Sequence, residues 1–92
     1  MSGKPKTEKL QILAVLEDGY WKKPYRIRWR LEKGFDLRPR LNTLRKNLQR
    51  CYKQGLVERR KIASSYFYRI KNRGRERLRI IRAKREKMYG WF

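Results

Sequence analysis

The stretch LRKNLQRCYKQGLVERRK, residues 44–61, holds the change of pattern from which the architecture of this chain can be predicted. Its first part belongs to a helix whose apolar side chains recur every three or four residues and share one face. Gly55 ends that helix, and β-branched and aromatic residues then flank a small polar centre, which is typical of a hairpin. The pattern predicts a helix over about 38–54 and a hairpin over about 56–70. The inward-facing residues of the helix are Leu41, Leu44, Leu48, Cys51 and Tyr52.

Two further helices are expected upstream. Thr7 has the chemistry of an N-cap for the first helix, and Asp18 and Gly19 mark its end, where glycine can take a left-handed turn. Pro24 fits the first position of the second helix, because a missing N–H costs nothing there. Gly34 is expected to end this second helix.

A charged helix from Asn72 to about Met88 is expected after the hairpin, with Leu78, Ile81, Met88 and Tyr89 along one side. The chain is long enough for one domain. We expect a flexible lead over 1–6, a single domain over 7–88 and an aromatic tail over 89–92. The fold class is therefore mainly α with a small β-hairpin.

The order of three helices, a hairpin and a last helix is that of winged helix-turn-helix proteins, and particular strings resemble that family. Residues 44–61 resemble a recognition helix followed by the Gly-Leu-Val that opens the wing. The string YRIKNRGRERLRII, residues 68–81, resembles the exit from the wing into the last helix, with Gly74 at the place of the family's glycine. Lys71 stands where the family has threonine, so the cap of the last helix is expected at Asn72.

The string ILAVLEDGYWKKPYRIRWRLEKG, residues 12–34, resembles the first two helices of PadR-like and MarR-like regulators. The small size is similar to that of compact regulators from archaea and their viruses. The resemblance covers about residues 7–88. It implies a three-helix core, a two-stranded wing and a C-terminal helix, and a DNA-binding transcription regulator.

Charge points in the same direction. The chain has 28 Lys and Arg against 8 Asp and Glu, a net charge of +20, and the whole excess lies in residues 22–92. Such a field favours a polyanionic partner, and nucleic acid is the default one. A membrane partner is not expected, because the sequence has neither a long basic amphipathic helix nor a transmembrane stretch. A single cysteine and the lack of an apolar leader favour a cytoplasmic protein.

The resemblance places the third helix in the major groove of DNA, where base edges can be read. Its first half is expected to read bases, its later cations to hold phosphates, and the wing and the second helix to contact the backbone or minor groove. The residues expected in the third helix are Arg38, Arg40, Asn42, Thr43, Arg45, Lys46, Arg50 and Lys53; those in the wing are Arg59, Arg60, Lys61, Ser64 and Ser65; those on the flank are Lys22, Lys23 and Arg26.

Other chemistry is weakly supported by the sequence. There is no histidine and one cysteine, so no metal site or other cofactor is expected. No nucleophile–base set or phosphate-binding glycine loop appears, so the chain is not expected to be an enzyme or to bind a small molecule. Cys51 is expected to be a buried thiol. Most aromatic residues are assigned to the core, notably Tyr25, Tyr52 and Tyr68, with Trp29 as the expected exposed exception.

The first and last helices are expected to form a homodimer, which would place two recognition helices about 34 Å apart, one duplex turn. Three alternatives stay open at this point. The charge suits an RNA-associated or ribosomal winged-helix protein as well as a DNA regulator. The chain could also coat DNA without sequence preference, or serve as a protein–protein adaptor.

Overall fold

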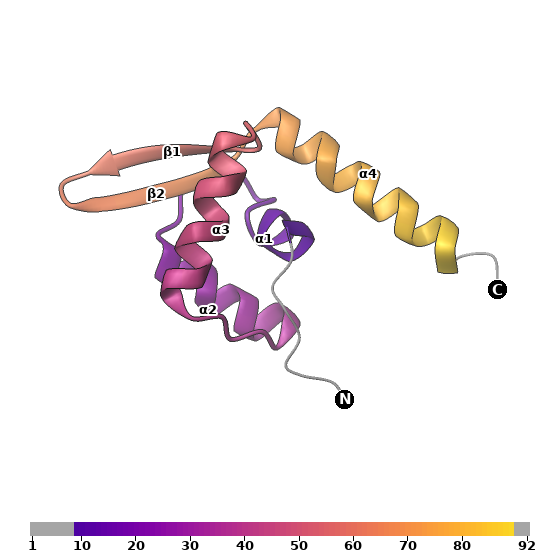
Figure 1. The fold of residues 1–92 in the computed structure, drawn as a ribbon, viewed down its shortest axis with the longest axis horizontal. Helices are drawn as coiled ribbons and strands as arrows, with labels where there is room; N and C mark the ends of the chain where they lie inside the picture. The colour runs from indigo at the N-terminus through magenta and orange to yellow at the C-terminus, as the bar shows by residue number, and fades with distance from the viewer. Residues whose placement is uncertain (1–8, 90–92) are drawn as a thin grey trace.

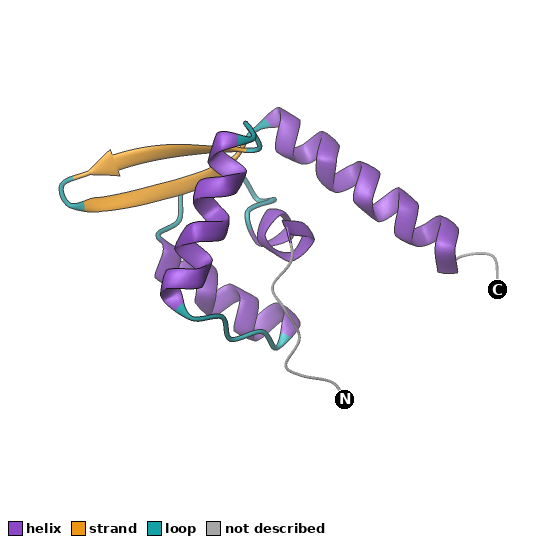
Figure 2. Ribbon diagram, in the orientation of Figure 1, coloured by secondary structure: helices purple, strands orange, loops and turns teal. Residues whose placement is uncertain are grey.

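The computed structural model describes the backbone of residues 9–89 and the side chains of residues 9–84. The predicted order of elements is confirmed (Figures 1 and 2). Three helices form one group, the hairpin projects from it, and the last helix runs off in another direction (Figure 1). The predicted cap at Thr7, the lead and the end of the tail lie outside the described residues. The elements are α1 (Lys9–Val15), α2 (Pro24–Phe35), α3 (Leu41–Lys53), β1 (Val57–Ile62), β2 (Ser65–Ile70) and α4 (Asn72–Tyr89).

The core lies between the first three helices and the base of the hairpin. Every described element contributes to it, and α4 adds Leu78. Truncating a fully buried leucine such as Leu48 to alanine would cost about 2–5 kcal/mol of stability. The fully buried side chains include Ile12, Leu13, Leu16, Ile27, Leu31, Leu44, Leu48, Leu56 and Val57.

The end of α2 differs from the prediction. Gly34 lies inside the helix, which continues to Phe35, and Asp36 takes the left-handed conformation with φ 55° and ψ 37°. The Asp36 N–H donates to the Glu32 carbonyl at 3.0 Å, and Leu37 follows into the core. A glycine costs a helix only about 1 kcal/mol, so burial of Leu37 decides where the chain turns.

The third helix is shorter at its start than predicted. It begins at Leu41, and extended Arg40 is its N-cap, whose carbonyl accepts from the Leu44 N–H at 2.9 Å. Arg38 lies in the preceding link, because a residue before proline is disfavoured in the helical region. The predicted end is confirmed: Gly55 follows with φ 75°.

The hairpin is an antiparallel pair with a two-residue turn. Val57 faces Ile70 and Ile62 faces Ser65, so Ala63 and Ser64 form the tip. Ala63 has φ 55° there, a conformation that alanine rarely adopts. A third segment joins the sheet at its base, since Lys22 and Tyr68 exchange two main-chain hydrogen bonds of 2.9 Å. This bridge ties the wing to the start of α2.

The last helix is attached to the body through α1 and the Leu56 turn. Arg82 donates to both carboxylate oxygens of Glu17 at 2.8 and 3.0 Å, and Arg75 donates to the Glu17 carbonyl at 2.9 Å. Asn72 is the first helical residue, and the Lys71 carbonyl accepts from the Arg75 N–H. The cap predicted at Asn72 is therefore wrong by one position, because the cap is the residue whose carbonyl takes the first helical bond.

Candidate nucleic-acid interface

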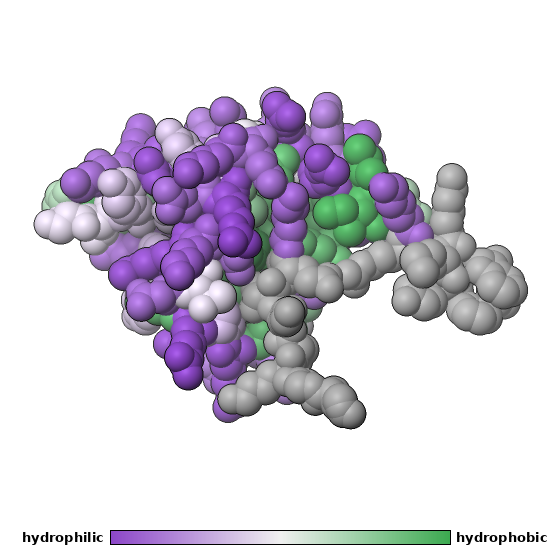
Figure 3. Space-filling model, viewed as in Figure 1, coloured by the Kyte–Doolittle hydropathy of each residue, from purple (hydrophilic) through white to green (hydrophobic). Residues whose placement is uncertain are grey.

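The outer face of α3 is polar and cationic. Leu44, Leu48 and Cys51 turn inward, as predicted, and leave the opposite face to solvent. The sequence from 37 to 57 has no acidic residue, so no carboxylate on this segment opposes its cations. Hydrophilic side chains cover α3 in the space-filling view (Figure 3). The exposed residues of α3 are Asn42, Thr43, Arg45, Lys46, Gln49, Arg50, Tyr52 and Lys53.

Two residues expected in the recognition helix lie just before it. Arg38 and Arg40 are both exposed. The Arg38 Nε lies 3.5 Å from the Glu32 carboxylate, which pairs it with α2. Arg40 stands at the N-cap, so its side chain leaves from the start of α3 rather than from the helix itself.

The cations of the wing, which we define as β1, its turn and β2, point to two different sides. Residues that face each other across an antiparallel ladder share one face. Arg59 faces buried Tyr68 and Lys61 faces Tyr66, whereas Arg60 faces Phe67 on the other side of the sheet. Arg59 and Lys61 therefore share the side that bears Val57 and Ile70 of the core, and Arg60 does not.

A groove of about 580 Å³ separates α3 from the wing, and the start of α2 closes its end. It brings together predicted residues from three regions that are distant in the sequence. Cationic and hydroxyl-bearing residues line one space there, a combination that suits a phosphodiester. The predicted residues that line it are Lys23, Arg45, Arg59, Ser64 and Ser65, and it is completed by Pro24, Tyr25, Gln49, Tyr66 and Tyr68.

Aromatic rings lie against many of the cations of the wing and of the start of α2. The Arg59 guanidinium carbon lies 4.2 Å from the centre of the Tyr52 ring and 4.7 Å from that of Tyr66. On the other side of the wing, Arg60 lies 5.1 Å from the centre of the Trp21 ring. Such contacts add about 0.5–1 kcal/mol each at exposed sites. Further pairs are Lys23 with Phe67, Arg26 with Trp29, Lys61 with Tyr66 and Arg69 with Trp21.

These contacts correct part of the aromatic prediction. Tyr68 is buried and Trp29 is 44% exposed, as expected, but Tyr25 is 70% and Tyr52 is 40% exposed. Tyr25 lies two residues before inward-facing Ile27, and two residues turn a helix side chain to the opposite face. Tyr52 has Arg50 and Lys53 near it in the sequence, whereas the arginine nearest after Tyr66 is Arg69. The pairing of both rings with Arg59 therefore had no signal among neighbouring residues.

Lys22 must be removed from the predicted interface. Its side chain is only 5% exposed, and its ammonium bonds to the Asp18 carboxylate and lies 3.4 Å from the Tyr20 carbonyl. Partial burial raises the pKa of Asp18, but hydrogen bonds from Lys22 and the Tyr20 N–H outweigh this, so the pKa falls below its usual value. Lys22 therefore neutralises Asp18 at the end of α1.

Two acids of the described region, Glu17 and Glu58, are paired away from α3. Hydrogen bonds from Arg82 lower the pKa of Glu17, and a cross-strand bond from Arg69 lowers that of Glu58. Glu58 lies on the same side of the wing as Arg60, away from the groove. Both carboxylates thus stay ionised without reducing the positive charge of the α3–wing groove.

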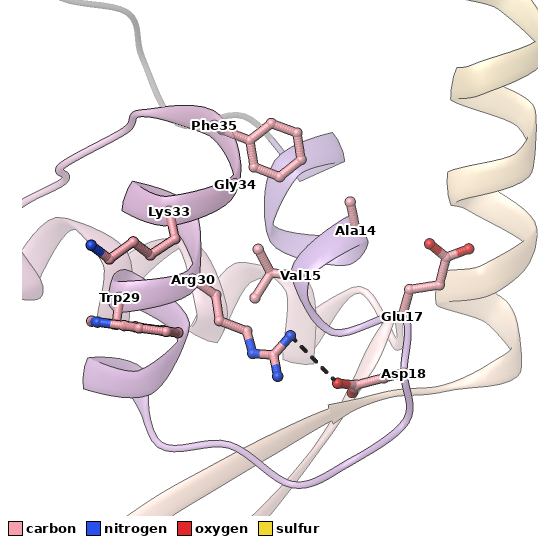
Figure 4. A pocket seen from close by; sticks show the side chains of 9 residues that line it. All are labelled: Ala14, Val15, Glu17, Asp18, Trp29, Arg30, Lys33, Gly34 and Phe35. Atoms are coloured by element: carbon pink, nitrogen blue, oxygen red, sulfur yellow. Dashed lines mark ion pairs between the residues drawn. The ribbon is translucent and has the colours of Figure 1, made fainter.

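A second hollow lies between α1 and α2, with a volume of about 620 Å³ (Figure 4). Trp29, Lys33 and Phe35 line its α2 side, and Arg30 reaches Asp18 at 3.8 Å. It is open and does not include α3. None of the predicted interface residues lines it.

Cys51 is buried, as predicted, and desolvation raises the pKa of its thiol. Among residues whose side chains the structure describes, no group of three or more His, Cys, Asp or Glu could hold a metal ion. Within the same part of the chain, no helix is both long and apolar enough to cross a membrane.

Three core helices, a two-stranded wing and a following helix, with the third helix turned to solvent, define the winged helix-turn-helix fold. No family model and no curated protein matches the sequence. Solved structures do. RosR of H. salinarum in its S1 complex aligns with a TM-score of 0.77 at 20% identity, over 92% of this chain and 76% of that one.

Two further structures have the same fold. F93 from STIV, a winged-helix DNA-binding protein, aligns with a TM-score of 0.77 at 16% identity, over 91% of this chain and 96% of that one. A PadR family transcription regulator from Clostridium difficile R20291 aligns with a TM-score of 0.75 at 16% identity, over 87% and 88% of the two chains. At such identities the likeness establishes the fold, and the predicted fold class is confirmed.

Proposed function

We propose that this chain binds double-stranded DNA with sequence preference and acts as a transcription regulator by occupying its site. The observation that carries the proposal is the exposed face of α3, where amide, hydroxyl and cationic side chains stand together without an acid. A major groove is about 12 Å wide and admits one helix. The likeness to a winged-helix DNA-binding protein and to a transcription regulator supports it.

The first half of α3 would read bases. Asn42 can bond adenine at two points, Thr43 can contact a thymine methyl group, and Arg45 or Lys46 can donate to guanine. Arg50 and Lys53, nearer the end of α3, would hold phosphates of the same groove. Arg40 at the N-cap and Arg38 before it would extend the contact along the backbone.

The wing would contact the adjacent backbone or minor groove. Arg59 and Lys61 lie on the groove side, and Ser64 and Ser65 line the same groove. These four residues are proposed to contact the backbone of one DNA strand. Arg60 would contact DNA from the other side of the wing. Lys23 and Arg26 at the start of α2 are proposed as flank contacts.

We also propose that residues 7–88 form a single domain. Two copies of this domain would form a homodimer through α1 and α4. Leu10 and Ala14 are only partly buried, and Ile80 is 49% exposed. The visible apolar surface gathers beside α4 (Figure 3). Leu78 cannot join the interface, because it is buried against its own domain, and the side chains of Met88 and Tyr89 lie outside the described residues. A dimer would favour a palindromic site.

The test is selection of binding sites from random duplex DNA at about 0.15 M salt, because low salt inflates nonspecific attraction. The proposal expects an enriched motif, with half-sites about one duplex turn apart for a dimer. Structured RNA is then added as competitor. Preference for the RNA would favour the RNA-associated alternative, and cooperative binding without enrichment would favour a DNA-coating protein.

A further inference from the structure

We propose that Tyr52 and Tyr66 are positioning residues that hold the Arg59 guanidinium in the α3–wing groove for a phosphodiester of the bound duplex. This inference rests on the proposed function, since it names how one cation of that interface is prepared. Tyr52 lies at the end of α3 and Tyr66 on β2, so two elements converge on one β1 side chain.

The contact is specific to one side of the wing. Arg59 faces buried Tyr68 across the ladder, which directs it toward the α3 side. Its guanidinium carbon lies 4.2 Å and 4.7 Å from the two ring centres. Arg59 is half-buried, although it belongs to a hairpin that projects from the body (Figure 1).

A ring over a guanidinium occupies its face and leaves its five N–H donors, which lie in the guanidinium plane, for oxygen acceptors. Among the described side chains, no carboxylate forms an ion pair with Arg59, and neighbouring Glu58 bonds Arg69 on the other side of the sheet. The positive charge of Arg59 therefore faces a groove that Arg45, Ser64 and Ser65 also line. This is the environment of a phosphate.

Holding the side chain in advance removes part of the cost of binding. Immobilising one flexible side chain costs an interface the equivalent of about two- to tenfold in affinity. Arg59 held by two rings would have lost that freedom before DNA arrives. Removing one ring should therefore weaken binding by about two- to tenfold without changing the net charge of the protein.

The experiment is a double-mutant cycle on the full chain. Dissociation constants for the selected duplex are measured across salt concentrations for Arg59→Ala, Tyr52→Leu, Tyr66→Leu and the two combinations with Arg59→Ala. Each leucine variant should weaken binding by about two- to tenfold alone and have almost no further effect beside Arg59→Ala. Tyr52→Phe and Tyr66→Phe should bind like the original chain, because phenylalanine retains the ring face. Tyr20→Leu is the matched control, an exposed tyrosine outside the groove, and it should leave binding unchanged.

Equal losses with and without Arg59 would overturn the proposal, because the tyrosines would then act independently. Phenylalanine variants as weak as the leucine variants would also overturn it, since a hydroxyl contact would then explain the effect. A measurement without any variant guards against misfolding: the Arg59 Nε–H of the free protein should be rigid by NMR relaxation. Mobility equal to that of Arg28, an exposed arginine of α2, would exclude a positioning role. If the unmodified chain fails to bind duplex DNA, the proposed function fails. The relaxation measurement still shows whether Tyr52 and Tyr66 hold the Arg59 side chain.

Discussion

Gly74 of α4 packs directly on the main chain of Leu56. A β-carbon added to Gly74 would lie 2.2 Å from the Leu56 carbonyl oxygen and 2.8 Å from the Ile70 side chain. The same carbonyl accepts from the Lys71 N–H at 3.0 Å, so it cannot move away freely. This contact fixes where α4 leaves the wing, and it explains why the position takes glycine.

Gly74→Ala should therefore destabilise the fold by about 1–3 kcal/mol, the usual cost of overpacking a filled site. Gly34→Ala is the matched control, because nothing lies within 4 Å of a β-carbon there and the residue is helical. It should stabilise the protein by about 0.5–1 kcal/mol. Urea unfolding measures both, and equal effects of the two changes would contradict the packing argument.

Acid should weaken the attachment of α4 to α1. The Glu17 pKa is lowered in the folded state by Arg82, so the pair contributes stability above the unfolded pKa, about 4.3, and loses it as pH falls through the folded value. The contribution should stay below about 1 kcal/mol, because both side chains are nearly half exposed. Melting temperatures from pH 7 to pH 3 should fall less steeply for Glu17→Gln than for the original chain. Parallel curves would mean that the pair contributes nothing.

Ala63→Gly should stabilise the wing. Ala63 has φ 55°, where a side chain costs roughly 1 kcal/mol and glycine has no such penalty. Hydrogen exchange of the β1 and β2 amides should slow in this variant. Ser64→Gly serves as the control, since Ser64 is not among the positive-φ residues, and it should not slow exchange.

Mutations of base-contacting and phosphate-contacting residues should differ in how they change the affinity for specific and for random DNA. Lys46→Ala should weaken binding to the selected site far more than binding to random DNA, because only a base contact depends on sequence. Arg60→Ala should weaken both about equally and reduce the salt slope by about 1. Titrations on both duplexes at several salt concentrations measure this. Equal losses from both changes would remove the base-reading role of α3.

Cys51 should resist alkylation in the folded protein at neutral pH. Its burial excludes the reagent, and its raised pKa suppresses the thiolate that reacts. Iodoacetamide labelling followed by mass spectrometry should be slow under native conditions and fast in urea. Native labelling as fast as that in urea would show that α3 opens readily.

Local patterns in the chain were enough to predict most of the fold. The three- and four-residue spacing of Leu44, Leu48 and Cys51 places these side chains on one face of a helix. The change of pattern after Gly55 indicates the wing. These features could be predicted because they depend on neighbours in sequence. The predicted end of α2 at Gly34 failed for the converse reason: the cost of one glycine is smaller than the gain from burying Leu37 against distant residues.

The amino-acid sequence by itself determined that this protein is a small cationic winged helix whose third helix turns its charge outward. The order of elements, the spacing of apolar residues and the net charge can all be obtained from the sequence alone. Only the tertiary structure decided which cations share a surface. It buried Lys22 on Asp18, turned Arg59 and Arg60 to opposite sides of the wing, and brought Tyr52 and Tyr66 onto Arg59. Those outcomes depend on strand register and on contacts between distant elements, which no local pattern of residues encodes.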